Sequence, residues 1–382
     1  GRRLATKLGD PHAGAVLAAG HAAILGMSGA LAEVAPLVRD SRELSADVAD
    51  RGLDLSLRTT RSLALYAAGD LGGVLRECAE PLRPEDLALQ PQPFGGSKVV
   101  EYLTLRGTAL VDTGRFGEGR RALDEAIAEA RRSGSAIAIC SAVAAASLRA
   151  RLTGADPESL LPACNEGLAL AEQARSDFMR SRLLGSLAEL NLLRGNIDEA
   201  VAQFREALGI VESDRERLRD DFGLLARLAG CLLFERDPSR ALAVADAALE
   251  AIEGHGGRLR EIEILMRWVW VHAAGGRTDP ASVEPRVQRA LALVAETGAW
   301  SREPFLRLAL AWIHRRRGEA ALAAAETARA LDDLDAMGFW DVGRMRMLEQ
   351  MRERLSPAQQ RSLWSFMSSF GVSARSGPAI LP

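Results

Sequence analysis

The segment Leu184–Glu212 reads LGSLAELNLLRGNIDEAVAQFREALGIVE, and the spacing of its small and aromatic residues decides the fold. Gly195 can adopt the left-handed backbone conformation that closes a helix. Ala200, Phe204 and Ala207 follow at spacings of four and three residues, so they share one face of a second helix. The segment therefore predicts a helical hairpin, in which alanine allows close approach and phenylalanine fills the groove between the helices.

The same turn position recurs along the chain at intervals of 40 to 45 residues. Around Gly114 the sequence reads GRFGEGRRALDEAI, and around Gly318 it reads GEAALAAAETARAL, with small or apolar residues at the matching places. A repeat of this length predicts stacked hairpins, because each unit packs only on its neighbours. The predicted turn residues are Gly29, Gly69, Gly114, Gly154, Gly195, Arg236, Gly276 and Gly318.

Composition and charge exclude several classes of protein. The chain has 382 residues, of which 48% are hydrophobic and 26% charged, as in ordinary soluble folded proteins. The net charge of −3 gives no field that would gather nucleic acid or anionic lipid, so we expect neither as a direct partner. We expect no membrane-spanning helix and no signal peptide, because no apolar stretch is long enough without interruption. We interpret the four cysteines as small buried helix residues in a reducing, cytoplasmic compartment.

Motifs that carry chemistry were sought and not found. The sequence contains no phosphate-binding G-x-x-x-x-G-K-[ST] loop, no H-E-x-x-H zinc motif and no G-x-S-x-G nucleophile motif. The five histidines are scattered, and His272 and His314 are interpreted as packed or surface residues. The sequence therefore predicts no catalytic residue, no cofactor and no metal site.

The pattern G-x-x-x-x-A-x-x-x-F-x-x-A-L at each turn resembles the tetratricopeptide family, although the usual period of that family is about 34 residues. A HEAT or armadillo array fits the longer period better, but it lacks this pattern at the turn inside each hairpin. The resemblance implies an all-α protein, a right-handed α-solenoid of about eight helical hairpins. Strand signals are almost absent, since aromatic residues make up 5% of the chain.

Units of about forty residues are similar to the sensor region of MalT-type and large ATP-binding LuxR-type regulators, and to helical regions of related bacterial kinases and cyclases. This resemblance implies a sensor or scaffold region of a multidomain bacterial regulator, which binds a protein, a peptide or a small-molecule inducer. The resemblance also implies adjoining ATPase or effector domains in the same polypeptide. The first residue is Gly1 rather than methionine, so we expect a fragment of a longer chain. The alternatives are a free-standing adaptor that bridges protein partners and an enzyme with an unrecognised site inside the superhelix.

Proline and glycine divide the chain. Residues 1–370 are predicted to form the solenoid, with a joint at 81–98, where several prolines and glycines prevent one continuous helix. Ser356 and Pro357 open a predicted amphipathic helix, 356–370, that covers the last hydrophobic face of the array. Residues 371–382 are predicted to be a loose tail.

The predicted binding surface lies on the inner wall, which the first helices of the hairpins line in tetratricopeptide arrays. Tryptophan and arginine dominate interface energetics. Trp270 and Trp312 each lie six residues before a predicted turn, and we propose them as the centre of this surface. Trp268 is expected to face the hairpin core instead. The alternative is that these tryptophans are packing residues. The candidate binding residues are Trp270, Trp312, Arg315, Glu263, Arg182, Glu189 and Arg151.

Overall fold

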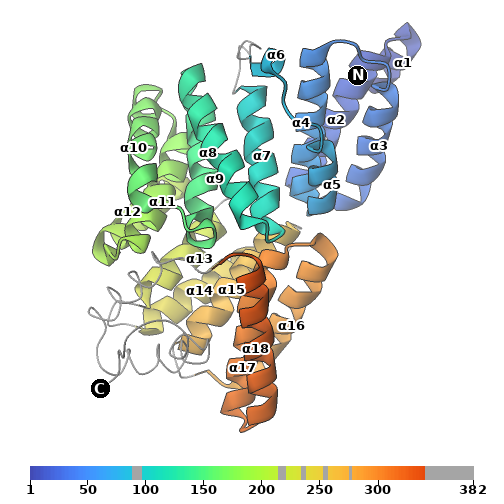
Figure 1. The fold of residues 1–382 in the computed structure, drawn as a ribbon. Helices are drawn as coiled ribbons and strands as arrows, with labels where there is room; N and C mark the ends of the chain where they lie inside the picture. Colours follow the sequence, from blue (N-terminus) through green and yellow to red (C-terminus); the bar gives the residue numbers. More distant parts are fainter. Residues whose placement is uncertain (88–96, 214–220, 234–237, 253–256, 275–277, 340–382) are drawn as a thin grey trace.

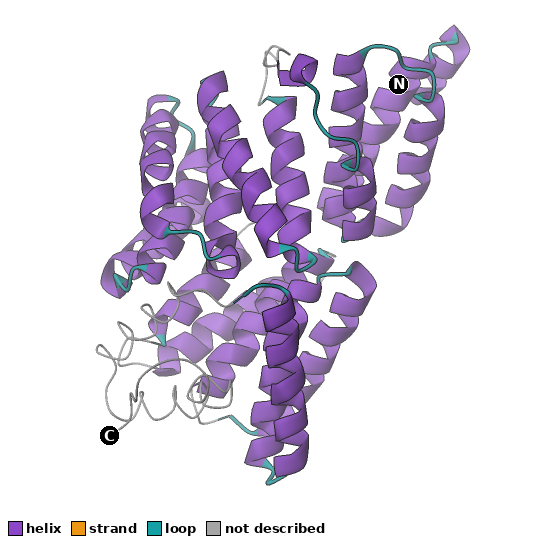
Figure 2. Ribbon diagram, viewed as in Figure 1, coloured by secondary structure: helices purple, strands orange, loops and turns teal. Residues whose placement is uncertain are grey.

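The computed structural model describes residues 1–87, 97–213, 221–233, 238–252, 257–274 and 278–339, and every regular element within them is helical. Figure 2 shows the same arrangement, with helices joined by short loops. The prediction of an all-α solenoid is confirmed.

The described helices form eight antiparallel hairpins, in the number that the repeat predicts. Two short helices, α1 (Arg2–Leu8) and α6 (Pro84–Leu87), lie outside the pairs. The first helices of the hairpins are α2 (Pro11–Ser28), α4 (Arg51–Ala68), α7 (Lys98–Asp112), α9 (Ala136–Thr153), α11 (Asp177–Leu193), α13 (Asp221–Leu232), α15 (Arg258–Ala274) and α17 (Glu303–Arg316). The second helices are α3 (Val34–Leu44), α5 (Leu71–Glu77), α8 (Phe116–Ser133), α10 (Pro157–Gln173), α12 (Ile197–Ser213), α14 (Pro238–Ile252), α16 (Pro280–Thr297) and α18 (Ala320–Ala336).

Glycine ends the first helix wherever the structure describes a predicted glycine turn. Each of these glycines has a positive φ between 64° and 89°, a region that a side chain disfavours. The prediction is confirmed at Gly29, Gly69, Gly114, Gly154, Gly195 and Gly318. The other two predicted turn residues, Arg236 and Gly276, lie outside the described residues.

The predicted small-residue faces are buried. On α12, Ala200, Phe204 and Ala207 have no exposed surface, as the spacing in the deciding segment predicts. Ala241 and Ala245 occupy the equivalent face of α14 and are also buried. Small side chains let the paired helices approach closely, so the core is continuous from hairpin to hairpin.

Successive first helices pack on one another, which places them on the inner wall of the array: α4 contacts α7, α7 contacts α9, α9 contacts α11, and α15 contacts both α13 and α17. The central helix α9 is apolar and long enough to cross a membrane by length and composition alone. However, 67% of it is buried inside the protein, and α7, α8, α10 and α11 all pack against it. Its apolar character is therefore that of a core helix.

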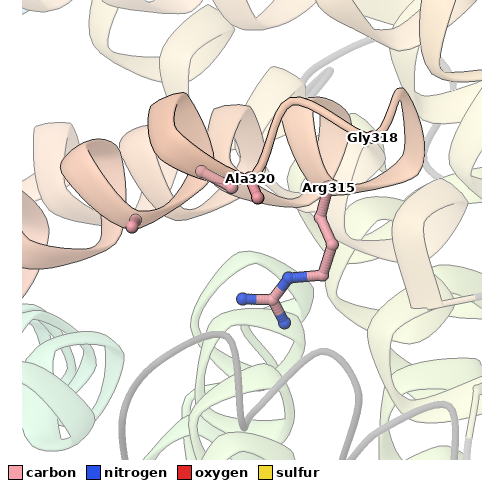
Figure 3. A pocket seen from close by; sticks show the side chains of 5 residues that line it. Arg315, Gly318 and Ala320 are labelled. Atoms are coloured by element: carbon pink, nitrogen blue, oxygen red, sulfur yellow. The ribbon is translucent and has the colours of Figure 1, made fainter.

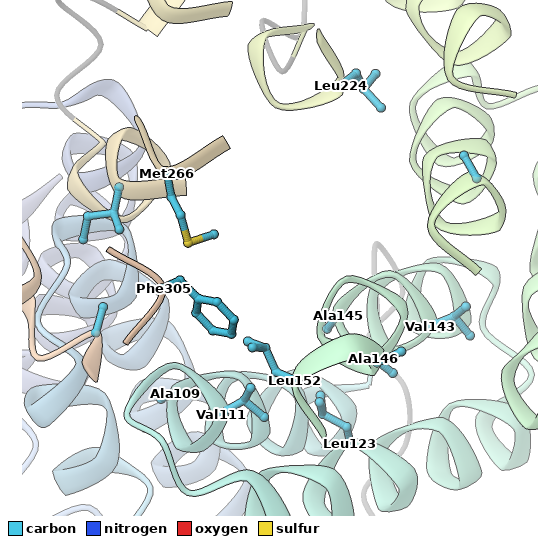
Figure 4. Close-up of a cluster of buried hydrophobic side chains, with 14 of the residues drawn as sticks. Ala109, Val111, Leu123, Val143, Ala145, Ala146, Leu152, Leu224, Met266 and Phe305 are labelled. Carbon is cyan, nitrogen blue, oxygen red and sulfur yellow. The ribbon is translucent and has the colours of Figure 1, made fainter. Parts of the chain in front are cut away.

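The array curves back on itself, so that parts far apart in the sequence touch (Figure 1). The lower ends of α4 and α7 meet α15 and the 3-10 turn η2 (Trp300–Arg302), which precedes α17. Leu152 of α9 and Phe305 of α17 point toward each other in the buried cluster drawn in Figure 4. We call this contact between the two halves of the array the junction.

Between the second and third hairpins, the described part of the predicted joint 81–98 is not one continuous helix. The second helix α5 is only seven residues long, and α6 precedes the start of α7 at Lys98. Asp86 of α6 is fully buried and accepts hydrogen bonds from Arg51 Nε and Nη2 at 2.7 and 2.8 Å, which ties this segment to α4. Its action as a joint stays a prediction. The predicted capping helix 356–370 and tail 371–382 lie outside the described residues.

All four cysteines are buried free thiols, as predicted. Burial raises the pKa of each of the four thiols above its ordinary value. These cysteines are therefore inert packing residues.

Candidate functional site

Charged side chains from four first helices converge on the inner wall. Arg151 comes from α9, Glu189 from α11, Arg227 from α13, and Glu263 and Arg267 from α15. We call these five residues the inner charge cluster. The structure thus brings together three of the sequence-predicted site residues, Arg151, Glu189 and Glu263, and adds two arginines that were not predicted.

Arg267 holds the centre of the inner charge cluster. Its Nη2 donates to Glu189 Oε1 at 3.1 Å, and its Nε donates to Glu263 Oε1 at 3.3 Å. Arg227 lies near the same two carboxylates, with Nε 3.8 Å from Glu189 Oε1 and Nη1 3.9 Å from Glu263 Oε1. These longer distances are ion-pair contacts rather than hydrogen bonds.

Burial and neighbouring charges shift the pKa values of Glu263 and Arg151 in this cluster. Burial alone would raise the pKa of Glu263, but Arg267, Arg227 and further arginines outweigh it and lower that pKa to about 2. Burial, together with the like charge of Arg267, lowers the pKa of Arg151 to about 10. Both groups are therefore charged at neutral pH.

The variant Glu263→Gln is expected to be less stable than the wild type at pH 7, by about 1–3 kcal/mol. The folded-state pKa of Glu263 lies below the unfolded value of about 4.3, so its contribution is complete above that value. It is lost as the pH falls toward 2. Urea unfolding of both proteins between pH 7 and 2.5 should show the difference shrinking below about pH 4.5. A difference that stays constant over this range would contradict the assignment.

A second charged group lies at the junction, and we call it the junction cluster. Asp112, at the end of α7, accepts hydrogen bonds from Arg149 Nη2 at 2.8 Å and from Tyr66 Oη at 3.1 Å. Arg302 of η2 donates to its other oxygen at 3.4 Å, across 190 positions of sequence. Arg149 and Arg302 also lower the pKa of Glu263, so the two clusters share one electrostatic environment on the inner wall.

Trp268, Trp270 and Trp312 differ in how far they are buried. Trp312 is only 7% exposed and belongs to the main buried core, which favours the packing alternative for it. Trp270 is half-buried, with its ring centroid 6.0 Å from that of Phe305 at the junction. Trp268 is buried where α15 meets two second helices: its Nε1 donates to Asp246 of α14 at 2.6 Å, and the guanidinium of Arg286 on α16 lies 4.3 Å from its ring centre.

The remaining predicted residues lie apart from the inner charge cluster. Arg315 lies in the last turn of α17 and lines a shallow pocket with Gly318, Ala320, Ala323 and Ala324, where its side chain extends away from the helix (Figure 3). Arg182 of α11 is half-buried, and its guanidinium lies 5.3 Å from the centre of the Phe178 ring. Within the described part of the chain, no group of three histidine, cysteine, aspartate or glutamate side chains is placed to hold a metal ion.

The sequence analysis missed Arg227 and Arg267, although a signal for them exists. Each lies nine residues before a predicted turn, at Arg236 and Gly276, so the two occupy equivalent places in neighbouring units. Counting from the tryptophans instead selected a place six residues before the turn. The place nine residues before the turn carries Arg227 and Arg267, which meet the carboxylates of the inner charge cluster.

Comparison with known proteins identifies the fold. No protein-family model and no curated protein sequence matches the chain. A Rap protein, solved with competence and sporulation factor, aligns with a TM-score of 0.61 at 12% identity, covering 94% of this chain and 97% of its own. NprR, solved with its cognate peptide NprX, aligns with a TM-score of 0.54 at 12% identity, covering 89% and 94%. The Rap conjugation gene regulator of plasmid pLS20, solved with the Phr* peptide, gives 0.51 at 11% identity, covering 85% and 96%.

These similarities agree with the repeat pattern and the helical hairpins: the chain has a tetratricopeptide-like helical-repeat fold.

Proposed function

We propose that this chain is a sensor region that binds a peptide or a peptide segment of a protein on the inner wall of its solenoid. The observation that carries the proposal is the inner charge cluster, because four first helices supply it and its residues span the wall. A ligand seated there would touch several hairpins at once. The similar Rap and NprR structures hold peptides, which supports a ligand of this class.

In the proposed role the chain regulates and does not catalyse. It belongs to a multidomain bacterial signalling or transcriptional regulator in the cytoplasm, and its adjoining ATPase or effector domain carries the output. Hairpins that pack serially transmit a local change to their neighbours. A ligand that contacts several first helices would therefore bias the arrangement that an effector domain reads.

Photo-crosslinking tests where a peptide binds. Peptides are first selected from a random display library on the purified chain. p-Benzoylphenylalanine is then placed at Arg182, two turns before Glu189 on the same face of first helix α11. The comparison position is Arg131, on second helix α8, where the native side chain pairs with Glu166 at 2.7 Å. We expect selected peptides to crosslink at position 182 and not at 131. Crosslinking at 131 alone, or failure of every selected peptide to react at 182, would overturn the proposal.

A further inference from the structure

Two arginines of the inner charge cluster have hydrogen-bonding capacity that their surroundings do not use. Arg267 engages both carboxylates of the cluster, Glu189 and Glu263. Arg227 reaches the same carboxylates only at 3.8 and 3.9 Å, and its buried Nε has no hydrogen-bond partner. Among the residues that the structure describes, Arg151 forms no hydrogen bond and no ion pair within 4.0 Å.

The inner wall carries an excess of positive charge at this place. The two adjoining clusters together hold five arginines, from Arg149 to Arg302, against the three carboxylates Asp112, Glu189 and Glu263. Counted over the residues of these two clusters, all of them in the described part of the chain, two positive charges exceed the negative ones. Removing a charged group from water without a partner is costly, so an excess of this kind lowers the stability of the unliganded fold.

The geometry of the guanidinium group indicates which kind of ligand could compensate the excess positive charge. Arginine presents five donors in a rigid planar fork, which matches the oxygens of a carboxylate or a phosphate. Arg151 and Arg227 belong to α9 and α13, on either side of the α11 residue Glu189, and both influence the pKa of the buried Cys231 thiol. An anionic group between these helices would use donors that no described residue engages.

We infer that the peptide bound on the inner wall presents an anionic group, a carboxylate or a phosphoryl group, and that Arg151 and Arg227 receive it. The inference rests on the proposed function, whose ligand it specifies. Arg267 positions Glu189 through a hydrogen bond, and Glu189 in turn lies 3.8 Å from Arg227. The carboxylates of the cluster limit the accepted charge, because a highly charged polyanion would be repelled by Glu189 and Glu263.

The first test uses small anions, which probe the site without any peptide. Succinate and inorganic phosphate are titrated in thermal melts at constant ionic strength, with chloride as the reference. We expect one or both to raise the melting temperature of the wild type and not that of the double variant Arg151→Gln/Arg227→Gln. The variant Arg131→Gln, which removes an exposed arginine of α8, is the matched control and should respond as the wild type does.

The double variant should fold, since among the described residues Arg151 has no ion-pair partner and Arg227 reaches its carboxylates only beyond hydrogen-bonding distance. In chloride alone its melting temperature is expected to equal or exceed that of the wild type. Arginines that merely support the fold would give the opposite result, a lower melting temperature without any anion.

The second test uses the peptides selected by display. Each acidic residue is replaced by its amide, and in a parallel series by phosphoserine, and affinity is measured by fluorescence anisotropy. Loss of the anionic group, or either of Arg151→Gln and Arg227→Gln, should weaken binding about 10- to 100-fold. Tighter binding of the original acidic peptides than of their phosphoserine variants would identify the anionic group as a carboxylate. The reverse order would identify it as a phosphoryl group.

The two proposals fail in different ways. Neutral peptides that crosslink at position 182 and bind the double variant as tightly as the wild type would overturn the anionic ligand and leave the proposed function standing. Anions that stabilise the wild type alone, with no peptide reacting at position 182, would preserve the anion site and reject the peptide-binding function. Equal responses of the wild type and the double variant to both probes would overturn the inference.

Discussion

Trp312→Ala is expected to lower the free energy of unfolding of the last described hairpin by about 3–5 kcal/mol. The Trp312 side chain is 7% exposed within α17, and its neighbours Ala311 and Ile313 have no exposed surface. Truncation removes a large apolar ring and leaves a cavity that close-packed helices fill only in part. The effect is expected to be local, because repeat stability is a sum of unit and nearest-neighbour terms.

Hydrogen exchange followed by mass spectrometry measures this change hairpin by hairpin. Protection should fall in α17 and α18 and persist in α7–α12. Trp300→Ala is the matched control, since that tryptophan is 43% exposed and its truncation should change stability by less than about 1 kcal/mol. If Trp312→Ala unfolds like the wild type and weakens peptide binding instead, the ring belongs to the binding surface and the packing assignment is wrong.

Trp312 also shows which part of the site the sequence could predict. Glycine at positive φ and small residues at helical spacing are local requirements, so the hairpins and their buried faces were readable from the repeat. The direction of one side chain on a first helix depends on its register relative to the turn. A shift of one residue rotates the side chain by about 100°. The uncertain turn position near Gly276 therefore left the direction of Trp270 open. Trp268 was placed correctly in the core, whereas Trp312 turned out to be buried as well.

The junction could not be predicted from the repeat. Each hairpin differs from the next by a small rotation, and these rotations add over several units before distant hairpins meet. The sequence of each repeat predicts how it packs on its neighbours, but it does not predict the curvature of the whole array. The pairing of Asp112 with Arg302 therefore has no sequence signal.

Asp112→Ala is expected to destabilise the array by about 3–5 kcal/mol and to loosen the junction. The Asp112 carboxylate is almost fully buried and is the acceptor shared by Tyr66, Arg149 and Arg302. Without it, Arg149 keeps a buried positive charge with no carboxylate at hydrogen-bonding distance among the described residues, which costs far more than the loss of a surface pair. Urea unfolding measures the loss of stability.

Small-angle X-ray scattering distinguishes a loosened junction from a purely local defect. Because Arg302 belongs to η2 and Asp112 to α7, their contact joins the two halves, and its loss should increase the radius of gyration. Glu118→Ala is the matched control. It removes an exposed carboxylate paired with Arg115 at the start of α8, and it should cost at most about 1 kcal/mol with an unchanged scattering profile. An Asp112→Ala protein that is as stable and as compact as the wild type would show that the apolar contact between Leu152 and Phe305 holds the junction without the charges.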